Sequence, residues 1–188
     1  TDNNETVITP NSEINLGIME SNLGNTCSNL WRTEAIKRVG GWNENQTSSQ
    51  EYDLLSRLCQ EGFSFQMQDN CKTVIRERVS GQISQGNQKL IWENYTKLRV
   101  SFFKHVIKPQ KNIDLIKKSI TIIFGATQIL YQHNPNLAVE IHDTVLKPNH
   151  FIPKATTVKS RIYVFIYMIF GYRYAECLRS MLRTPKRT

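Results

Sequence analysis

Hydrophobic residues recur at helical spacing along most of the chain. Between 50 and 60, the positions Leu54, Leu55 and Leu58 fall on one face of a helix, which we expect to end at Gly62. The same spacing predicts further helices over 14–20, 34–39, 88–106, 112–133, 135–146 and 158–182.

Residues typical of helix starts and ends flank the helices predicted at 34–39 and 50–60. Thr33 is expected to cap the helix at 34–39, and Gly40-Gly41 to stop it. Ser48 or Ser49 is expected to cap the helix at 50–60.

Three short stretches in the first half have features of β-strands. Residues 63–68 alternate apolar and polar side chains, which indicates a strand with one buried face. The small and polar residues of 25–31 fit a short buried strand, and 72–78 fits a second strand after a turn at 69–70. The pattern therefore predicts an α+β, helix-rich fold.

The change of pattern divides the chain into three parts. A mixed α/β part covers 1–86, a helical extension covers 87–150, and a basic, aromatic C-terminal helix lies within 151–188. Residues 147–156 contain two prolines and are expected to form the linker before the last helix.

The net charge of +8 is concentrated at the C-terminal end. Residues 154–188 contain eight Lys or Arg and a single acidic residue, Glu176. These charges flank the apolar run 162–172, whose eleven residues fall short of the roughly 20 needed for a membrane-spanning helix.

Three interpretations of this C-terminal segment stay open. It can be a buried helix with solvated ends, a helix lying in the interface of an anionic membrane, or a nucleic-acid binder. Nucleic acid is the least favoured, because binders of that kind interleave basic and aromatic residues instead of flanking an apolar block. We therefore predict no nucleic-acid partner.

The four cysteines and four histidines show no spacing typical of a metal site. No CxxC pair is present, and the histidines are scattered along the second half of the chain. We therefore expect no metal ligands in this chain, and reduced thiols in a cytoplasmic protein.

The residues with the clearest chemical interest are Glu51 and Asp53, in the first turn of the helix predicted at 50–60. Exposed N–H groups at a helix start stabilise a carboxylate, so such a group can act as a general base or bind a hydroxyl. Ordinary first-turn acidic residues have the same placement, and the pattern alone favours that simpler interpretation.

Three segments in order resemble the acceptor side of family 2 glycosyltransferases, which have a GT-A type of fold. They are GNTCSNLWRTEAIKRVGGWNE at 24–44, QEYDLLSRL at 50–58 and, after Gly62-Phe63, IRERVSGQIS at 75–84. Each motif is weak alone, but their order and spacing together are fairly specific. The resemblance implies the C-terminal half of a GT-A-like α/β domain, followed by an all-helical extension.

The resemblance also implies roles for individual residues. Glu51 stands where the family has the general base that deprotonates the acceptor hydroxyl, and Asp53 would orient the helix start or that hydroxyl. Acceptor binding would fall to Trp42, Asn29 and Gln50, although Trp42 fits a core aromatic equally well.

Arg76 and Arg78 lie where relatives place residues near the donor diphosphate, and a solvated strand edge is the alternative. The family also has an Asp-x-Asp that holds Mg²⁺ or Mn²⁺, whereas no two of the five aspartates here stand two residues apart. We therefore expect that the donor-binding half is missing, that this chain alone holds no divalent cation, and that it is inactive by itself.

The resemblance thus implies a glycosyltransferase of polysaccharide biosynthesis. Its partners would be a nucleotide sugar, a saccharide or lipid-linked acceptor, a separate donor-binding half and an anionic membrane surface. The alternative is a non-catalytic sugar- or membrane-binding module left from a split enzyme. In either case we expect a cytoplasmic protein, either in solution or peripheral on the inner face of the plasma membrane.

Overall fold

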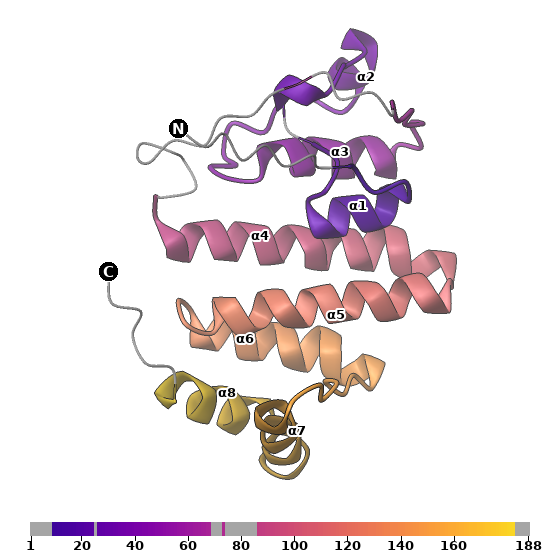
Figure 1. Cartoon of the computed structure of the whole chain (residues 1–188). Helices are drawn as coiled ribbons and strands as arrows, with labels where there is room; N and C mark the ends of the chain where they lie inside the picture. The colour runs from indigo at the N-terminus through magenta and orange to yellow at the C-terminus, as the bar shows by residue number, and fades with distance from the viewer. Residues whose placement is uncertain (1–8, 25, 69–72, 74–85, 183–188) are drawn as a thin grey trace, which may run out of the picture. The chain divides into compact units, whose positions relative to one another are not determined.

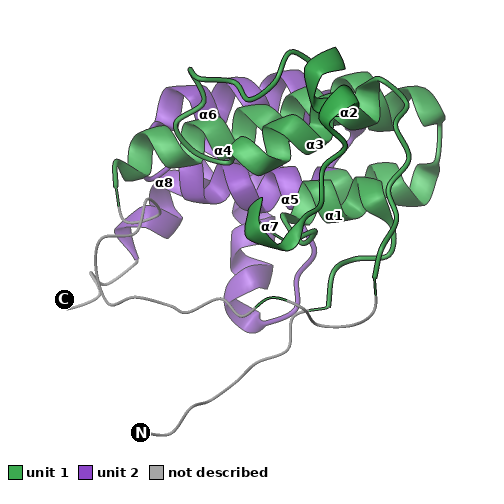
Figure 2. Cartoon of the chain, turned by 90° about the horizontal axis from the view of Figure 1, so that it is seen from above, with its two compact units in different colours: residues 1–119 green, residues 120–188 purple. Residues whose placement is uncertain are grey.

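A computed structural model describes residues 9–24, 26–68, 73 and 86–182. These residues form helices joined by loops, and none of the described residues belongs to a β-strand (Figure 1). The chain divides into two units, Thr1–Ser119 and Ile120–Thr188 (Figure 2). The three-part division expected from the sequence stays a prediction.

Unit 1 contains four complete α-helices and three short helical turns within its described residues. They are α1 (Ile14–Glu20), the 3-10 turn η1 (Thr26–Ser28), α2 (Thr33–Arg38), α3 (Gln50–Gln60), α4 (Gln88–Phe102), the π-helical turn η3 (Phe103–Ile107) and the 3-10 turn η4 (Lys108–Gln110). The helix α5 (Ile113–Leu130) begins in unit 1 and runs past its boundary.

The core of unit 1 lies where α1, α3 and α4 contact one another (Figure 1). The apolar face of α3 is buried through Leu54, Leu55 and Leu58, as its spacing predicted. Ile18 and Met19 of α1 are buried as well. Removing such side chains from water is the main stabilising contribution to a small unit of this kind.

One buried cation joins α4 to α1. Arg99 is almost completely buried and donates hydrogen bonds to the carbonyl oxygens of Met19, at 2.7 Å, and Tyr95, at 2.8 Å, and to the hydroxyl of Ser21. Its guanidinium also lies over the Tyr95 ring. Burial lowers the pKa of Arg99 to about 10. The charge is therefore satisfied by neutral oxygens and a ring face instead of a carboxylate.

Unit 2 is built from the rest of α5 and five later helical segments. These are α6 (Pro135–Ile141), the π-helical turn η5 (His142–Leu146), the 3-10 turn η6 (Lys147–Asn149), α7 (Val158–Phe170) and α8 (Tyr172–Met181). Asn134 caps α6 by accepting a hydrogen bond from the Leu137 amide. Thr157 and Ser160 form a reciprocal capping box at the start of α7.

A carboxylate is enclosed in unit 2. Glu176 of α8 is fully buried, and its oxygens accept hydrogen bonds from Tyr163 Oη at 2.6 Å, Gln128 Nε2 at 3.0 Å and Arg179 Nε at 2.7 Å. Arg179 also donates to the carbonyl oxygen of Gln128. The cluster joins α5, α7 and α8 through one buried ion pair whose polar atoms have partners.

The expectation of an α+β fold is wrong for the described residues, and with it the expectation of a GT-A-like half domain. Residues 26–28 form the turn η1 instead of a strand. Residues 63–68 are irregular, although their half-buried and exposed side chains do alternate as predicted. Apart from Thr73, the strand expected at 72–78 lies outside the described residues. A strand needs a hydrogen-bonded neighbour, and no described segment supplies one.

Two further expectations need correction. The single helix predicted over 158–182 is broken into α7 and α8 at Gly171, whose φ of +84° is unfavourable for residues with a side chain. Thr33 is the first residue of α2 instead of its cap, and the cap position, Arg32, makes no side-chain bond. The helix predicted at 50–60 is confirmed residue for residue.

Candidate functional site

The candidate site is built around the start of α3 and the loop that precedes it. Ser49 occupies the cap position of α3 without making a side-chain cap bond. The first turn of α3 therefore carries its acidic residues, Glu51 and Asp53, next to backbone N–H groups that no cap side chain occupies.

Glu51 is half-buried. Its Oε1 atom accepts a hydrogen bond of 2.6 Å from the hydroxyl of Thr26, the first residue of η1. This bond orients the carboxylate and connects two segments that are 25 residues apart. The next residue, Tyr52, is buried. Its phenol oxygen accepts a hydrogen bond from the Leu23 amide and donates one to the Gly24 carbonyl oxygen. Glu51 and Tyr52 therefore both attach the start of α3 to the segment before η1 and to η1 itself.

Asp53 points to a different partner. Arg57 lies one turn later on α3 and donates hydrogen bonds to Asp53 Oδ2 from Nε, at 3.0 Å, and from Nη2, at 2.7 Å. The Nη1 atom of Arg57 donates to the carbonyl oxygens of Val39, at 2.5 Å, and Gly41, at 2.8 Å. Asp53 and Arg57 together therefore hold the end of α2 and its glycine turn against α3.

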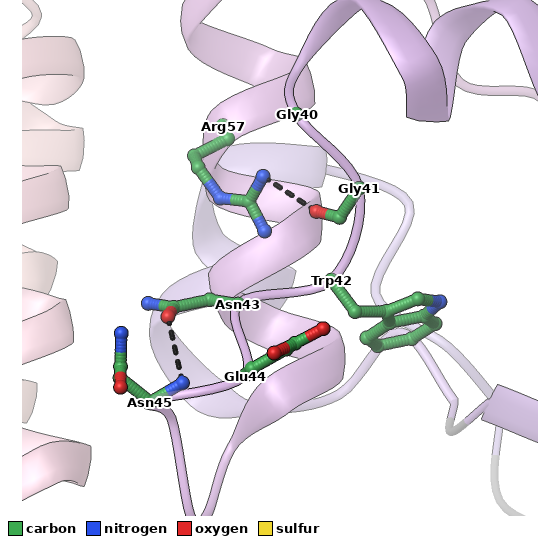
Figure 3. A pocket seen from close by; sticks show the side chains of 7 residues that line it. All are labelled: Gly40, Gly41, Trp42, Asn43, Glu44, Asn45 and Arg57. Atoms are coloured by element: carbon green, nitrogen blue, oxygen red, sulfur yellow. Dashed lines mark hydrogen bonds between the residues drawn. The ribbon is translucent and has the colours of Figure 1, made fainter.

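The loop held in this way borders an open hollow of about 460 Å³ (Figure 3). Its lining residues come from the loop after α2 and from α3: Gly40, Gly41, Trp42, Asn43, Glu44, Asn45 and Arg57. Asn43 stabilises the loop by accepting a hydrogen bond from the Asn45 amide at 3.1 Å. The hollow is lined mainly by polar groups, which can hydrogen-bond a hydroxyl-rich ligand.

A second hollow, of about 320 Å³, shares one wall with the first. Trp42, Asn43 and Glu44 line both hollows, and the remaining lining of the second comes from Thr26, Gln46 and Gln50. Glu51 lines neither hollow, but its hydrogen-bond partner Thr26 and its chain neighbour Gln50 both line the second. A ligand in the second hollow would therefore contact residues next to the Glu51 carboxylate.

Trp42 is the aromatic wall between the two hollows. Its side chain is 38% exposed, and its ring meets Trp31 edge to face, with the ring centroids 5.8 Å apart. The contact with Trp31 thus covers part of the indole, and about two fifths of Trp42 stays exposed. Both roles weighed from the sequence, a core aromatic and a flat surface for a sugar, are compatible with this position.

The other predicted site residues fall into two groups. Asn29 follows η1, is half-buried and lines neither hollow, so the structure does not bring it to Trp42 and Gln50. Arg76 and Arg78 lie outside the described residues.

The prediction from sequence missed the contributions of Thr26 and Glu44. The segment 24–44 contains both residues, but only the fold places Thr26 on Glu51.

The described residues contain no group of three His, Cys, Asp or Glu side chains placed to hold a metal ion. Among the same part of the chain, no helix combines the length and hydropathy needed to cross a membrane. Two cysteines in the described segments, Cys59 and Cys177, form no disulfide.

Comparison with known proteins gives no family assignment. No model of a protein family matches the chain, and neither a curated protein nor a solved structure is significantly similar to it.

Proposed function

We propose that the chain binds the saccharide acceptor of a glycosyltransferase and that Glu51 is the general base of the transfer. The observation that carries the proposal is the Glu51 carboxylate at the start of α3, oriented by Thr26 and adjacent to a hollow that combines polar side chains with an aromatic wall. The motif order from 24 to 84 supports it independently, since the hollow is lined by residues of two of those segments.

The proposed reaction is a direct displacement at the anomeric carbon of a nucleotide sugar. Glu51 takes the proton of an acceptor hydroxyl while the hydroxyl oxygen forms a bond to the anomeric carbon. The bond from that carbon to the diphosphate breaks, and its electron pair leaves with the nucleoside diphosphate. Positioning of the base within hydrogen-bond reach of the hydroxyl is the contribution of the protein in this step.

The remaining residues have supporting roles in this proposal. Trp42 presents its open face to the acceptor ring, and Gln50 hydrogen-bonds acceptor hydroxyls. Asp53 is a positioning residue, because its ion pair with Arg57 holds the loop that carries Trp42. The diphosphate contacts of Arg76 and Arg78, the donor-binding half and its Mg²⁺ or Mn²⁺ stay predictions from the resemblance.

We also propose a cytoplasmic place of action. The thiols of Cys59 and Cys177, which form no disulfide, fit a reducing compartment, where nucleotide sugars are also made. The protein would work there either in solution or at the inner face of the plasma membrane.

Acceptor binding is tested on the full chain by titrating a panel of neutral oligosaccharides and following tryptophan emission and saturation-transfer NMR. At least one oligosaccharide should bind, and Trp42→Ala should weaken it by about tenfold or more, equal to about 1.4 kcal/mol. Trp92→Phe is the control, because Trp92 lies on α4 and lines neither hollow. If no oligosaccharide of the panel bound, the proposal would be wrong.

The catalytic role is tested in the protein expressed from the complete coding region, by measuring release of nucleoside diphosphate. Glu51→Gln should lower turnover by about 10² or more and leave acceptor affinity nearly unchanged. Glu34→Gln is the matched control, since Glu34 is also in the first turn of a short helix but lines neither hollow. Acceptor binding without turnover would instead support the alternative, a non-catalytic sugar-binding module.

A further inference from the structure

An exposed apolar stripe runs along the whole of α7. Val158, Ile162, Phe165 and Ile169 follow the spacing i, i+4, i+7 and i+11, which places them on one face of the helix. Their side chains are 72%, 55%, 63% and 57% exposed. This stripe is about three turns long and lies on the side of α7 that unit 2 does not cover.

A second exposed apolar stripe lies on α8. Tyr174, Leu178 and Met181 follow the spacing i, i+4 and i+7, and all three are exposed. The ring centroids of Phe170, at the end of α7, and Tyr174 lie 6.4 Å apart across the break at Gly171.

The opposite faces of both helices are already used in the core of unit 2. Tyr167 of α7 is buried and hydrogen-bonded to His142 at 2.7 Å, and Tyr172, Ala175 and Glu176 of α8 are buried. The residues of the two stripes therefore do not pack in the core of unit 2. Scattered exposed apolar residues are ordinary, but rows of them on two successive helices indicate a binding surface.

The charges beside the α7 stripe are basic. Lys159 and Arg161 are exposed and, by their helical positions, flank the stripe on its two sides. The only acidic residue from 151 to 188 is Glu176, and it is buried against Arg179. An apolar face bordered by Lys and Arg complements a surface with acyl chains below anionic headgroups.

From these observations we infer that α7 and α8 bind the surface of a bilayer containing anionic phospholipids. The two apolar stripes insert at the boundary between headgroups and acyl chains, while Lys159 and Arg161 contact headgroup phosphates. With 13 residues, α7 lies in this interface instead of crossing the bilayer. The inference depends only on the surface of unit 2 and is independent of the proposed sugar site.

Sedimentation of the full chain with vesicles tests the inference. The chain should sediment with vesicles of equal amounts of phosphatidylglycerol and phosphatidylcholine, and much less with phosphatidylcholine alone. The double variant with Phe165→Ser and Ile169→Ser should lose at least about tenfold in partition, because two large apolar side chains no longer enter the lipid. Ile113→Ser is the control, since Ile113 is equally exposed at the start of α5 in unit 1.

A second variant keeps the test valid if the apolar changes disturb folding. Lys159→Ser with Arg161→Ser alters only exposed side chains and should weaken binding to anionic vesicles by about fivefold per residue, an effect that added salt should mimic. Equal binding to neutral and anionic vesicles, or unchanged binding of the Phe165 and Ile169 variant, would overturn the inference. A vesicle-free dimer abolished by the same apolar variant would also overturn it, by assigning the stripes to a second copy of the chain.

Discussion

The guanidinium of Arg57 donates two hydrogen bonds to one carboxylate oxygen of Asp53, Oδ2, at 3.0 and 2.7 Å. Both side chains belong to α3, yet the third nitrogen of Arg57 reaches the carbonyl oxygens of Val39 and Gly41 in a different segment. The pair is therefore a connection between α3 and the glycine turn that leads to Trp42.

We expect Arg57→Ala to lower the free energy of unfolding of unit 1 by about 2 kcal/mol, because two carbonyl groups and a carboxylate lose a charged donor. Arg57→Lys should cost about half as much, since an ammonium group keeps the charge but cannot serve both carbonyls and Asp53 at once. Urea unfolding followed by tryptophan emission measures this, because Trp31, Trp42 and Trp92 all belong to unit 1.

The matched control for Arg57 is Arg38→Ala. Arg38 lies 3.6 Å from a carboxylate oxygen of Glu61, but both side chains are largely exposed. Such surface pairs contribute at most about 1 kcal/mol, so this change should have a clearly smaller effect than Arg57→Ala. Similar losses for the two variants would show that the contacts to Val39 and Gly41 do not stabilise the loop.

Local sequence signals predicted the helices well and the strands badly. The helix α3 begins and ends where its apolar spacing and Gly62 indicate, because helical hydrogen bonds are local and the pattern reports the buried face directly. Alternation in 63–68 correctly indicated one half-buried face, but it contains no information on whether a second segment pairs with it. The helical pattern failed to predict the break at Gly171, because the apolar run 162–172 continues through that glycine.

The candidate site was predictable in its acidic residues but not in their partners. The first-turn position of Glu51 and Asp53 follows from the helix start at Gln50. Their different surroundings do not, since Glu51 meets Thr26 while Asp53 meets Arg57. Contacts between segments 25 residues apart depend on how the chain folds back, which no local pattern records.

The buried carboxylate of unit 2 gives a second stability prediction. Glu176→Ala should lower the free energy of unfolding by about 3–5 kcal/mol, because Arg179 then stays partly buried without its anion. Glu176→Gln should cost less, since its amide oxygen can still accept from Tyr163. The measurement is urea unfolding followed by far-UV circular dichroism, together with hydrogen exchange of α8 amides.

Glu140→Ala controls for the loss of a glutamate in the same unit. Glu140 is exposed on α6, and its replacement should change stability by no more than about 0.5 kcal/mol. If Glu176→Ala proved as mild as Glu140→Ala, the hydrogen-bonded cluster would contribute little to the stability of unit 2.

Three tyrosines of unit 2 connect its stability to alkaline pH. Burial raises the pKa of Tyr163 and of Tyr172, and the charge of Glu176 raises each further. Burial, with a smaller effect of Asp143, raises the pKa of Tyr167 to about 12. The folded unit therefore keeps phenol protons that an unfolded chain releases near pH 10.

Because the unfolded state binds fewer protons above pH 10, the free energy of unfolding should fall as pH rises from about 10 to about 12. Below pH 10 these phenols are protonated in both states and contribute no pH dependence. Urea unfolding at a series of pH values measures the slope, and Tyr167→Phe should make it shallower although it also removes the hydrogen bond to His142. Tyr174→Phe, at an exposed position, should leave the slope unchanged. An unaltered slope in Tyr167→Phe would mean that the Tyr167 phenol ionises equally in the folded and unfolded chain.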